Sequence, residues 1–321
     1  MQIEKFNLDK NNPDVTLTAY LLDDSPEMLK GTPRPALIIC PGGGYFSCSD
    51  REAEPVAMYF ANQGYHTFVL RYTTYSKGSL AMPDLSKPLP EKKESQYPRQ
   101  IRELGQSMLL IRKNAEKWHV DSRRIGVCGF SAGGHVAALY STVFNEPVLT
   151  DYLGATAKEL RPAVTILGYA ITDYHLLDQD VKAKKDSPMD YAFMKASNVA
   201  FLGQEFPDEE TEREVSPVDH VDSDTPPFFI WTTATDPLVT PINSLNLAKV
   251  LAEHKIPYEI HIFGEGGHGL SLGTQAVAEA KSQINPKVGQ WTTLCTKWLE
   301  KYFAPDLPEK SDFEKIQEKI K

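Results

Sequence analysis

The stretch "GVCGFSAGGHVAAL", residues 126–139, places a serine between two glycines where a hydrophobic run gives way to a helical pattern. The residues before the serine are typical of a strand, and apolar side chains over 136–143 recur at helical spacing. Gly129, Ser131 and Gly133 thus form a G-x-S-x-G pentapeptide on a strand–turn–helix unit, where backbone strain exposes the serine hydroxyl. This context favours a nucleophile over the alternative, in which Ser131 is an ordinary helix N-cap.

Short apolar runs and helical patterns alternate along most of the chain. The expected strands are 35–40, 66–72, 124–130, 163–169, 227–234 and 258–263, and the expected helices are 52–63, 99–118, 131 onward, 241–254 and 288–303. β-Branched and aromatic runs bounded by Gly and Pro, with helices between them, predict an α/β fold in which helices cover both faces of a parallel sheet. We expect a single domain over 1–303, because no flexible or proline-rich linker separates two such units.

Two segments interrupt this alternation. Residues 74–97 carry three prolines and many polar groups, and residues 171–226 contain short helical pieces but no clear strand. Both follow strands, at the carboxyl edge where open α/β sheets bind ligands, so we expect cap-like insertions there. A plain surface loop is an equal alternative for 74–97. The amphipathic tail over 304–321 predicts a helix that is docked on the body or frayed.

Bulk composition narrows the classes of function. A chain of 321 residues with 41% hydrophobic content has enough apolar side chains for a substantial core. Its net charge of −9, without a cluster of Lys and Arg, argues against a nucleic-acid partner. No apolar stretch is long enough to span a membrane, and "MQIEKFNLDK" lacks the pattern of a secretory leader, so we expect a cytoplasmic protein. The four cysteines have no metal-type spacing, and no metal or cofactor is expected.

Main-chain amides near the serine are candidates for an oxyanion hole. Ala132 follows the serine at a helix N-terminus, where amides are free and the helix dipole is positive. The glycine-rich segment "CPGGGYF" (40–46) follows the strand 35–40, and its backbone folds close to a neighbour without side chains in the way. We expect Gly43 and Gly44 to supply further donors, against the alternative of a glycine turn without a chemical role.

A serine hydroxyl needs a base to become a nucleophile. His268 lies in "GEGGHGL", directly after the last expected strand, and its glycine neighbours let it swing over the sheet edge. Three other histidines compete less well. His261 lies inside the strand, His254 ends a helix, and His135 points down the helix that follows the serine, so we expect structural roles for them.

An acid must orient the base. Asp236 in "WTTATDPLV" follows the preceding strand and is the first candidate, although Asp-Pro at a strand end is also a common turn. Asp173, one strand earlier, is the fallback. Asp219 and Asp222 lie in the cap-like segment and rank below both.

The ordered motifs "PGGGYF", "GFSAGGHVAA", "ATDPLV" and "FGEGGHGL" make the chain similar to α/β-hydrolases of the esterase/lipase group. More narrowly, the chain resembles the acetylxylan-esterase-like and bifunctional acetyl/feruloyl esterase (BD-FAE-like) branch over about 15–303. The resemblance implies a mostly parallel central sheet of about eight strands with small cap insertions. It also implies roles for specific residues: Ser131 as nucleophile, Asp236 as acid, His268 as base, and Gly43, Gly44 and Ala132 as oxyanion donors.

Two positions depart from the pattern of the group. Related hydrolases often have His-Gly-Gly-Gly where this chain has Pro41 before its three glycines, so the loop must be braced in another way. Glu103 stands where the group often has Asp, and we expect it to be a structural anchor.

Together these features predict a serine esterase that acts through an acyl-enzyme on small acyl esters. The resemblance implies acetyl esters of sugars or oligosaccharides as substrates and leaves a homo-oligomer open. Aromatic residues near strand ends offer weak candidates for substrate-binding walls: Tyr45, Tyr72, Tyr75, Tyr169 and Trp231. The alternatives are a serine peptidase of the prolyl-oligopeptidase type, a non-catalytic binding protein on the same fold, and a hydrolase or lyase of carbon–carbon bonds.

Overall fold

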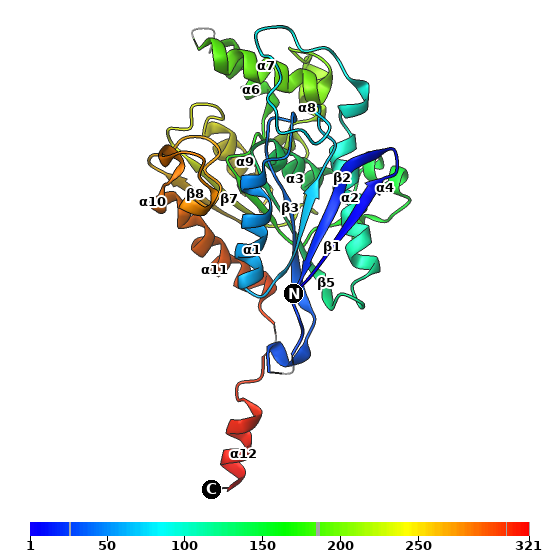
Figure 1. The fold of residues 1–321 in the computed structure, drawn as a ribbon, viewed down its shortest axis with the longest axis vertical. Coiled ribbons are helices and arrows are strands. Elements are labelled where there is room, and N and C mark those ends of the chain that lie inside the picture. Colours follow the sequence, from blue (N-terminus) through cyan, green and yellow to red (C-terminus); the bar gives the residue numbers. More distant parts are fainter. Residues whose placement is uncertain (26, 184–186, 306, 321) are drawn as a thin grey trace.

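The computed structural model, which describes residues 1–25, 27–183, 187–305 and 307–320, is built around one eight-stranded sheet (Figure 1). The strands are β1 (Gln2–Asp9), β2 (Asn12–Leu21), β3 (Arg34–Cys40), β4 (His66–Arg71), β5 (Val120–Phe130), β6 (Thr165–Gly168), β7 (Phe228–Thr233) and β8 (Tyr258–Phe263). They lie in the order β1-β2-β4-β3-β5-β6-β7-β8. All neighbours from β4 to β8 are parallel, and β1 and β2 are antiparallel. The predicted α/β class is confirmed.

Helices cover both faces of the sheet. The α-helices are α1 (Glu54–Asn62), α2 (Arg99–Lys113), α3 (Ser131–Val143), α4 (Pro147–Leu153), α5 (Ala157–Leu160), α6 (Tyr174–Ala183), α7 (Pro188–Leu202), α8 (Glu209–Glu214), α9 (Ile242–Glu253), α10 (Pro286–Gly289), α11 (Trp291–Phe303) and α12 (Asp312–Ile320). The short 3-10 helices are η1 (Leu29–Gly31), η2 (Asp50–Glu52), η3 (Lys93–Ser95), η5 (Pro217–Asp219), η6 (Gln275–Val277) and η7 (Lys281–Gln283).

The two faces of the sheet carry separate hydrophobic cores. Along β3, Leu37 and Ile39 pack with side chains of α1 and α11, while Ala36 and Ile38 pack with side chains of α2, α3 and α9. This alternation is the period of two that a strand imposes. Because helices cover both faces, a residue of a central strand is buried whichever way it points, which explains the continuous apolar runs in the sequence.

The N-terminal hairpin of β1 and β2 was not among the expected strands. Val15, Leu17 and Ala19 alternate with polar or half-buried positions along β2 and are fully buried, so the period-two signal was present in the sequence. The hairpin continues the sheet beyond β4 through the antiparallel pairing of β2 with β4. It extends the buried sheet rather than forming a separate unit.

The segment 171–226 forms α6, α7, α8 and η5, which gather at one end of the sheet (Figure 1). This segment leaves β6 at its carboxyl end, as the sequence indicates for a cap. The segment 74–97 contains only the short helix η3, and its chain contacts α7 through a hydrogen bond from the Ser95 hydroxyl to the Ala200 carbonyl at 3.2 Å. Both insertions therefore lie over the carboxyl edge.

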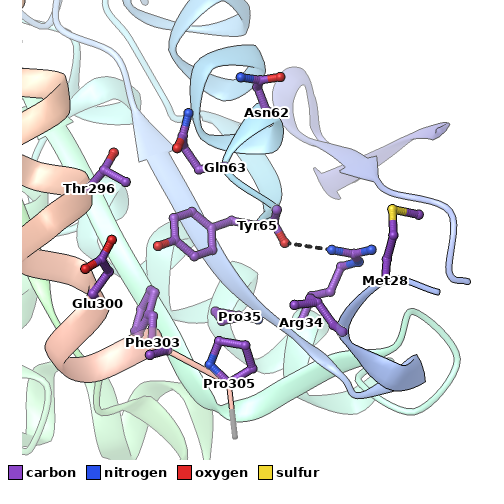
Figure 2. Close-up of a pocket in the computed structure, with 13 residues that line it drawn as sticks. Met28, Arg34, Pro35, Asn62, Gln63, Tyr65, Thr296, Glu300, Phe303 and Pro305 are labelled. Atoms are coloured by element: carbon purple, nitrogen blue, oxygen red, sulfur yellow. Dashed lines mark hydrogen bonds between the residues drawn. The ribbon is translucent and has the colours of Figure 1, made fainter. Parts of the chain in front are cut away.

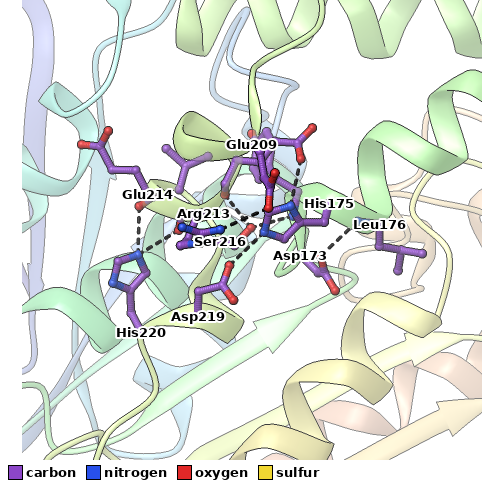
Figure 3. Close-up of polar contacts among 12 residues, drawn as sticks. Asp173, His175, Leu176, Glu209, Arg213, Glu214, Ser216, Asp219 and His220 are labelled. Atoms are coloured by element: carbon purple, nitrogen blue, oxygen red, sulfur yellow. Dashed lines mark hydrogen bonds and ion pairs between the residues drawn. The ribbon is translucent and has the colours of Figure 1, made fainter.

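A cluster of polar side chains ties the cap elements together (Figure 3). His175 of α6 pairs through Nδ1 with Glu212 of α8 at 2.8 Å and through Nε2 with Asp219 of η5 at 3.1 Å. Burial alone would lower the pKa of His175, but the hydrogen bonds and charges of the two carboxylates outweigh it and raise that pKa. A protonated imidazolium, which donates from both ring nitrogens, fits this position.

The opposite end of the molecule holds a cavity of about 500 Å³ between the start of β3, the end of α1 and the end of α11 (Figure 2). It lies at the amino ends of the parallel strands, away from the cap. The tail forms α12, which projects from this same end (Figure 1). No described residue of α12 is buried, and Phe313 and Ile316 are 68% and 54% exposed. Of the two expectations for this helix, docked on the body or frayed, the first is therefore wrong for the described residues.

Glu103 of α2 is a structural anchor, as the sequence predicts. Its side chain is buried and accepts hydrogen bonds from the amide of Thr73, at 2.7 Å, and from the Thr73 hydroxyl. These bonds fix the chain just after β4 to the first turns of α2. Burial raises the pKa of Glu103 to about 7, although the bonds from Thr73 act in the opposite sense.

We expect Glu103→Gln to flatten the dependence of stability on pH. The folded pKa lies above the value of 4.5 for a free glutamate, so the folded state binds more protons than the unfolded state between about 4.5 and 7. The stabilisation is complete below that window and is lost as pH rises through it, by on the order of 3 kcal/mol at most. Urea unfolding at several pH values measures this slope. The exposed Glu116→Gln is the control, and equal slopes for the Glu103 variant and the wild type would contradict the assignment.

Candidate active site

Ser131 lies on a strained turn between β5 and α3. Its φ of +50° is in the left-handed region, which a residue with a side chain seldom adopts. Two residues later, a Cβ added to Gly133 would lie 2.2 Å from the carbonyl oxygens of both Cys40 and Pro41. Only glycine allows the two backbones to approach so closely. The turn thus presses the start of α3 against the end of β3 and leaves the hydroxyl at the sheet edge.

The three side chains predicted as a triad form one chain of hydrogen bonds. Ser131 Oγ lies 2.8 Å from His268 Nε2, and His268 Nδ1 lies 2.7 Å from Asp236 Oδ2. His268 comes from the loop after β8, and Asp236 from the loop after β7. With Nδ1–H donated to the carboxylate, Nε2 is left as an acceptor for the serine proton.

The carboxylate of Asp236 is itself held in place. Its other oxygen, Oδ1, accepts the amides of Leu238 at 2.9 Å and Val239 at 3.1 Å. The carboxylate side chain is 1% exposed, whereas the imidazole of His268 is 16% exposed. The acid is therefore shielded from water while the base stays open to a ligand.

The predicted oxyanion donors lie beside the serine. Gly43 and Gly44 have φ values of +135° and +59°, which turn the backbone of the loop sharply. A Cβ added to Gly42 would lie 2.9 Å from Cβ of Ser131, so this loop passes directly beside the serine. The amides of Gly43, Gly44 and Ala132 donate no hydrogen bond to another residue in the described ranges. They are free for an oxyanion.

Two side chains brace the glycine loop, where related hydrolases often use a histidine. The hydroxyl of Tyr72 donates to the carbonyl of Pro41 at 2.6 Å. The buried carboxylate of Glu52 accepts the amide of Gly42 at 2.7 Å. Glu52 was missed in the sequence, where "SDREAEP" offers several acidic residues and no signal that one of them is buried.

The aromatic residues proposed as substrate walls are core residues, which corrects that expectation. Tyr45, Tyr72, Tyr75, Tyr169 and Trp231 are all buried. Tyr45 stacks on Phe201 with ring centroids 4.2 Å apart, and Trp231 stacks on Trp291 at 5.0 Å. These five side chains are at most 5% exposed, so they offer little surface to a substrate.

The competing histidines have structural partners. His135 is fully buried, donates from Nε2 to the Val215 carbonyl at 2.6 Å and is bonded at Nδ1 to the Tyr45 hydroxyl. Burial lowers its pKa to about 4, so it stays neutral. His261 pairs with Glu259 at 2.8 Å, and His254 bonds to the Val250 carbonyl.

The competing acids are also occupied elsewhere. Asp173 accepts the amide of Leu176 at the start of α6 and a hydrogen bond from Asn246, both within 3.0 Å. Asp219 pairs with His175, and Asp222 caps its own turn by accepting the amide of Thr225. Asp236 is therefore the candidate acid that the structure places against His268.

Among the described residues, we find no cluster of three metal-ligating side chains arranged to hold an ion. Within the same residues, every helix is too short or too polar to cross a bilayer.

One family model and several known hydrolases match this chain. The BD-FAE family model matches residues 89–251, about half of the chain. The carboxylesterase Cest-2923 of Lactobacillus plantarum superposes with a TM-score of 0.71 at 29% identity, covering 94% of this chain and 98% of its own. An acetyl ester-xyloside bifunctional hydrolase of Caldicellulosiruptor lactoaceticus gives 0.69 at 30% identity, covering 92% and 90%.

A longer relative matches part of its own length. Endo-1,4-beta-xylanase B of Butyrivibrio fibrisolvens is 31% identical over 261 residues, which are 80% of this chain and 34% of that protein. The chain therefore spans about a third of the length of this relative. The family model, the solved esterases and the order of the four motifs lead to one conclusion: the chain belongs to the BD-FAE family of α/β-hydrolases.

Proposed function

We propose that the protein is a serine esterase that hydrolyses small acyl esters through an acyl-enzyme. One observation carries the proposal: the hydrogen-bonded chain Ser131–His268–Asp236 ends beside three amides without a bonding partner among the described residues. A nucleophile, a base, an acid and oxyanion donors are the parts that acyl transfer needs.

In the first half of the reaction, the oxygen of Ser131 bonds to the ester carbonyl carbon while His268 Nε2 takes the serine proton. Asp236 stabilises the imidazolium that forms, through the hydrogen bond to Nδ1. The carbonyl oxygen becomes an oxyanion and is stabilised by the amides of Ala132 and of Gly43 or Gly44. His268 then gives its proton to the departing alcohol as the carbon–oxygen bond breaks, and the acyl group stays on Ser131.

In the second half, a water molecule replaces the alcohol. The oxygen of the water attacks the acyl carbon while His268 takes a proton from the water. The same amides stabilise the second oxyanion. Collapse of this intermediate breaks the bond to Ser131, which recovers its proton from His268. The carboxylic acid leaves, and the starting state is restored.

A small acyl group fits the surroundings of the glycine loop. Phe193 of α7 reaches down from the cap, and a Cβ added to Gly44 would lie 2.7 Å from its ring atom Cζ. The ring also packs edge-on against Phe46, with centroids 5.4 Å apart. If the carbonyl oxygen of an ester accepts hydrogen bonds from these amides, the first few carbon atoms of a longer acyl chain would already contact the ring of Phe193. An acetyl ester of a sugar suits this limit, and the solved relative that is described as an acetyl ester-xyloside hydrolase supports it.

We expect Ser131→Ala to lower kcat for p-nitrophenyl acetate by several orders of magnitude, because the nucleophile is removed. The same variant should lose labelling by a fluorophosphonate probe and keep its melting temperature. Release of p-nitrophenol measures the rate, with the exposed Ser223→Ala as the control. Undiminished turnover by the folded Ser131 variant would remove this serine from the mechanism.

We expect Phe193→Ala to admit longer acyl chains. Removing the ring opens space above Gly44, so the ratio of kcat/KM for butyrate to that for acetate should rise by about tenfold, in the range that apolar contacts discriminate. A series of p-nitrophenyl esters from acetyl to octanoyl measures the ratio. Phe206→Ala, in the same insertion and 40% exposed, is the matched control. An unchanged ratio would mean that the acyl group lies elsewhere.

A further inference from the structure

Glu52 is a buried carboxylate that belongs to none of the motifs. It ends the short helix η2 and is 4% exposed. Its oxygen Oε2 accepts the amide of Gly42 at 2.7 Å, and its oxygen Oε1 accepts the hydroxyl of Tyr169 at 2.5 Å. A carboxylate is costly to bury without hydrogen-bond partners, so these two bonds stabilise Glu52 in its buried position.

Tyr169 carries the link on to the histidine. It follows β6 with a φ of +38° and is 2% exposed. Its hydroxyl donates to Glu52 and accepts the amide of Ser271, three residues beyond His268, at 3.0 Å. Its ring lies against the imidazole of His268, with centroids 4.9 Å apart and planes inclined by 67°. The same side chain therefore touches the base and fixes the loop that carries it.

The hydroxyl of Tyr169 stays protonated and so remains a donor. Burial raises its pKa well above the ordinary value for tyrosine, and the carboxylate of Glu52 raises it further. Glu52 and Tyr169 thus form one hydrogen-bonded unit between two loops that lie far apart in the chain.

Other contacts hold the segment after His268 without reaching the glycine loop. Ser271 Oγ donates to the carbonyl of Arg51 at 2.6 Å, and Trp291 Nε1 donates to the carbonyl of Ser271 at 2.9 Å. These bonds secure the fold of the segment. The unit of Glu52 and Tyr169 differs, because Glu52 accepts the amide of Gly42, one residue before Gly43, while the Tyr169 ring contacts the imidazole.

We propose that Glu52 and Tyr169 are positioning residues that set where the oxyanion donors stand relative to the base. The proposal rests on the proposed function, and neither residue is assigned a contact with substrate. Displacing donors or base by a fraction of an ångström weakens stabilisation of the transition state more than binding of the ground state. Loss of the unit should therefore appear in kcat rather than in KM.

The test uses Glu52→Gln, Tyr169→Phe and the double variant in the full chain. We expect each single variant to lower kcat for p-nitrophenyl acetate by about 10- to 100-fold with KM within threefold, which is less than the loss of about 100- to 1000-fold when an oxyanion donor is removed outright. The double variant should lose little more than either single variant, because the two side chains act as one unit. Glu54→Gln, two residues along and exposed, is the matched control and should leave kcat unchanged.

Melting temperatures separate positioning from folding. If Glu52→Gln fails to fold, Tyr169→Phe, which removes one oxygen atom, decides the question alone. Folded single variants with kcat within twofold of the wild type would overturn the proposal, as would losses that multiply in the double variant.

The proton between His268 Nδ1 and Asp236 gives a readout that does not depend on esterase activity. Its downfield proton NMR signal should shift or broaden in Tyr169→Phe, because loss of the hydroxyl removes the bonds to Glu52 and Ser271 that hold the ring against the imidazole. If the wild type hydrolyses no ester, the proposed function fails and this signal alone decides. An unchanged signal would then overturn the positioning role.

Discussion

The close approach of two backbones, at the end of β3 and at the start of α3, is the constraint on which the site depends. Gly133 lies against the carbonyls of Cys40 and Pro41 with no room for a side chain. Because β3 and β5 are parallel neighbours, their chains leave the sheet at the same edge. Backbone packing alone therefore places the glycine loop beside the serine turn. The loops after β7 and β8 add Asp236 and His268 at the same edge.

Much of this edge could be predicted because its signals are local. A serine between glycines after a strand, and a histidine among glycines after the last strand, report the backbone geometry that their own neighbours require. Glu52 and Tyr169 give no such signal. They are separated by 117 positions, and their contact exists only once η2 and the end of β6 are brought together. In the sequence each is an ordinary acidic or aromatic residue.

The aromatic residues also show what the sequence cannot predict, because they were expected near the substrate and are buried in the core. Tyr45 lies in the glycine loop after β3 and Trp231 lies within β7, and in the sequence an exposed wall and a core residue have the same pattern at such positions. Only the packing of Phe201 on one and Trp291 on the other decides that both are buried. The hairpin of β1 and β2 was missed for a different reason. Its alternation of apolar and polar residues is present in the sequence, but it lies before the first of the four motifs.

The cap leaves the sheet after β6 and returns at β7, whereas the serine, the histidine and the glycine loop belong to other connections. A lengthened, shortened or exchanged cap would alter the space above Ser131 while leaving its hydrogen bond to His268 in place. The segment that covers the site and the residues of the hydrogen-bonded chain are therefore encoded in separate stretches of the sequence.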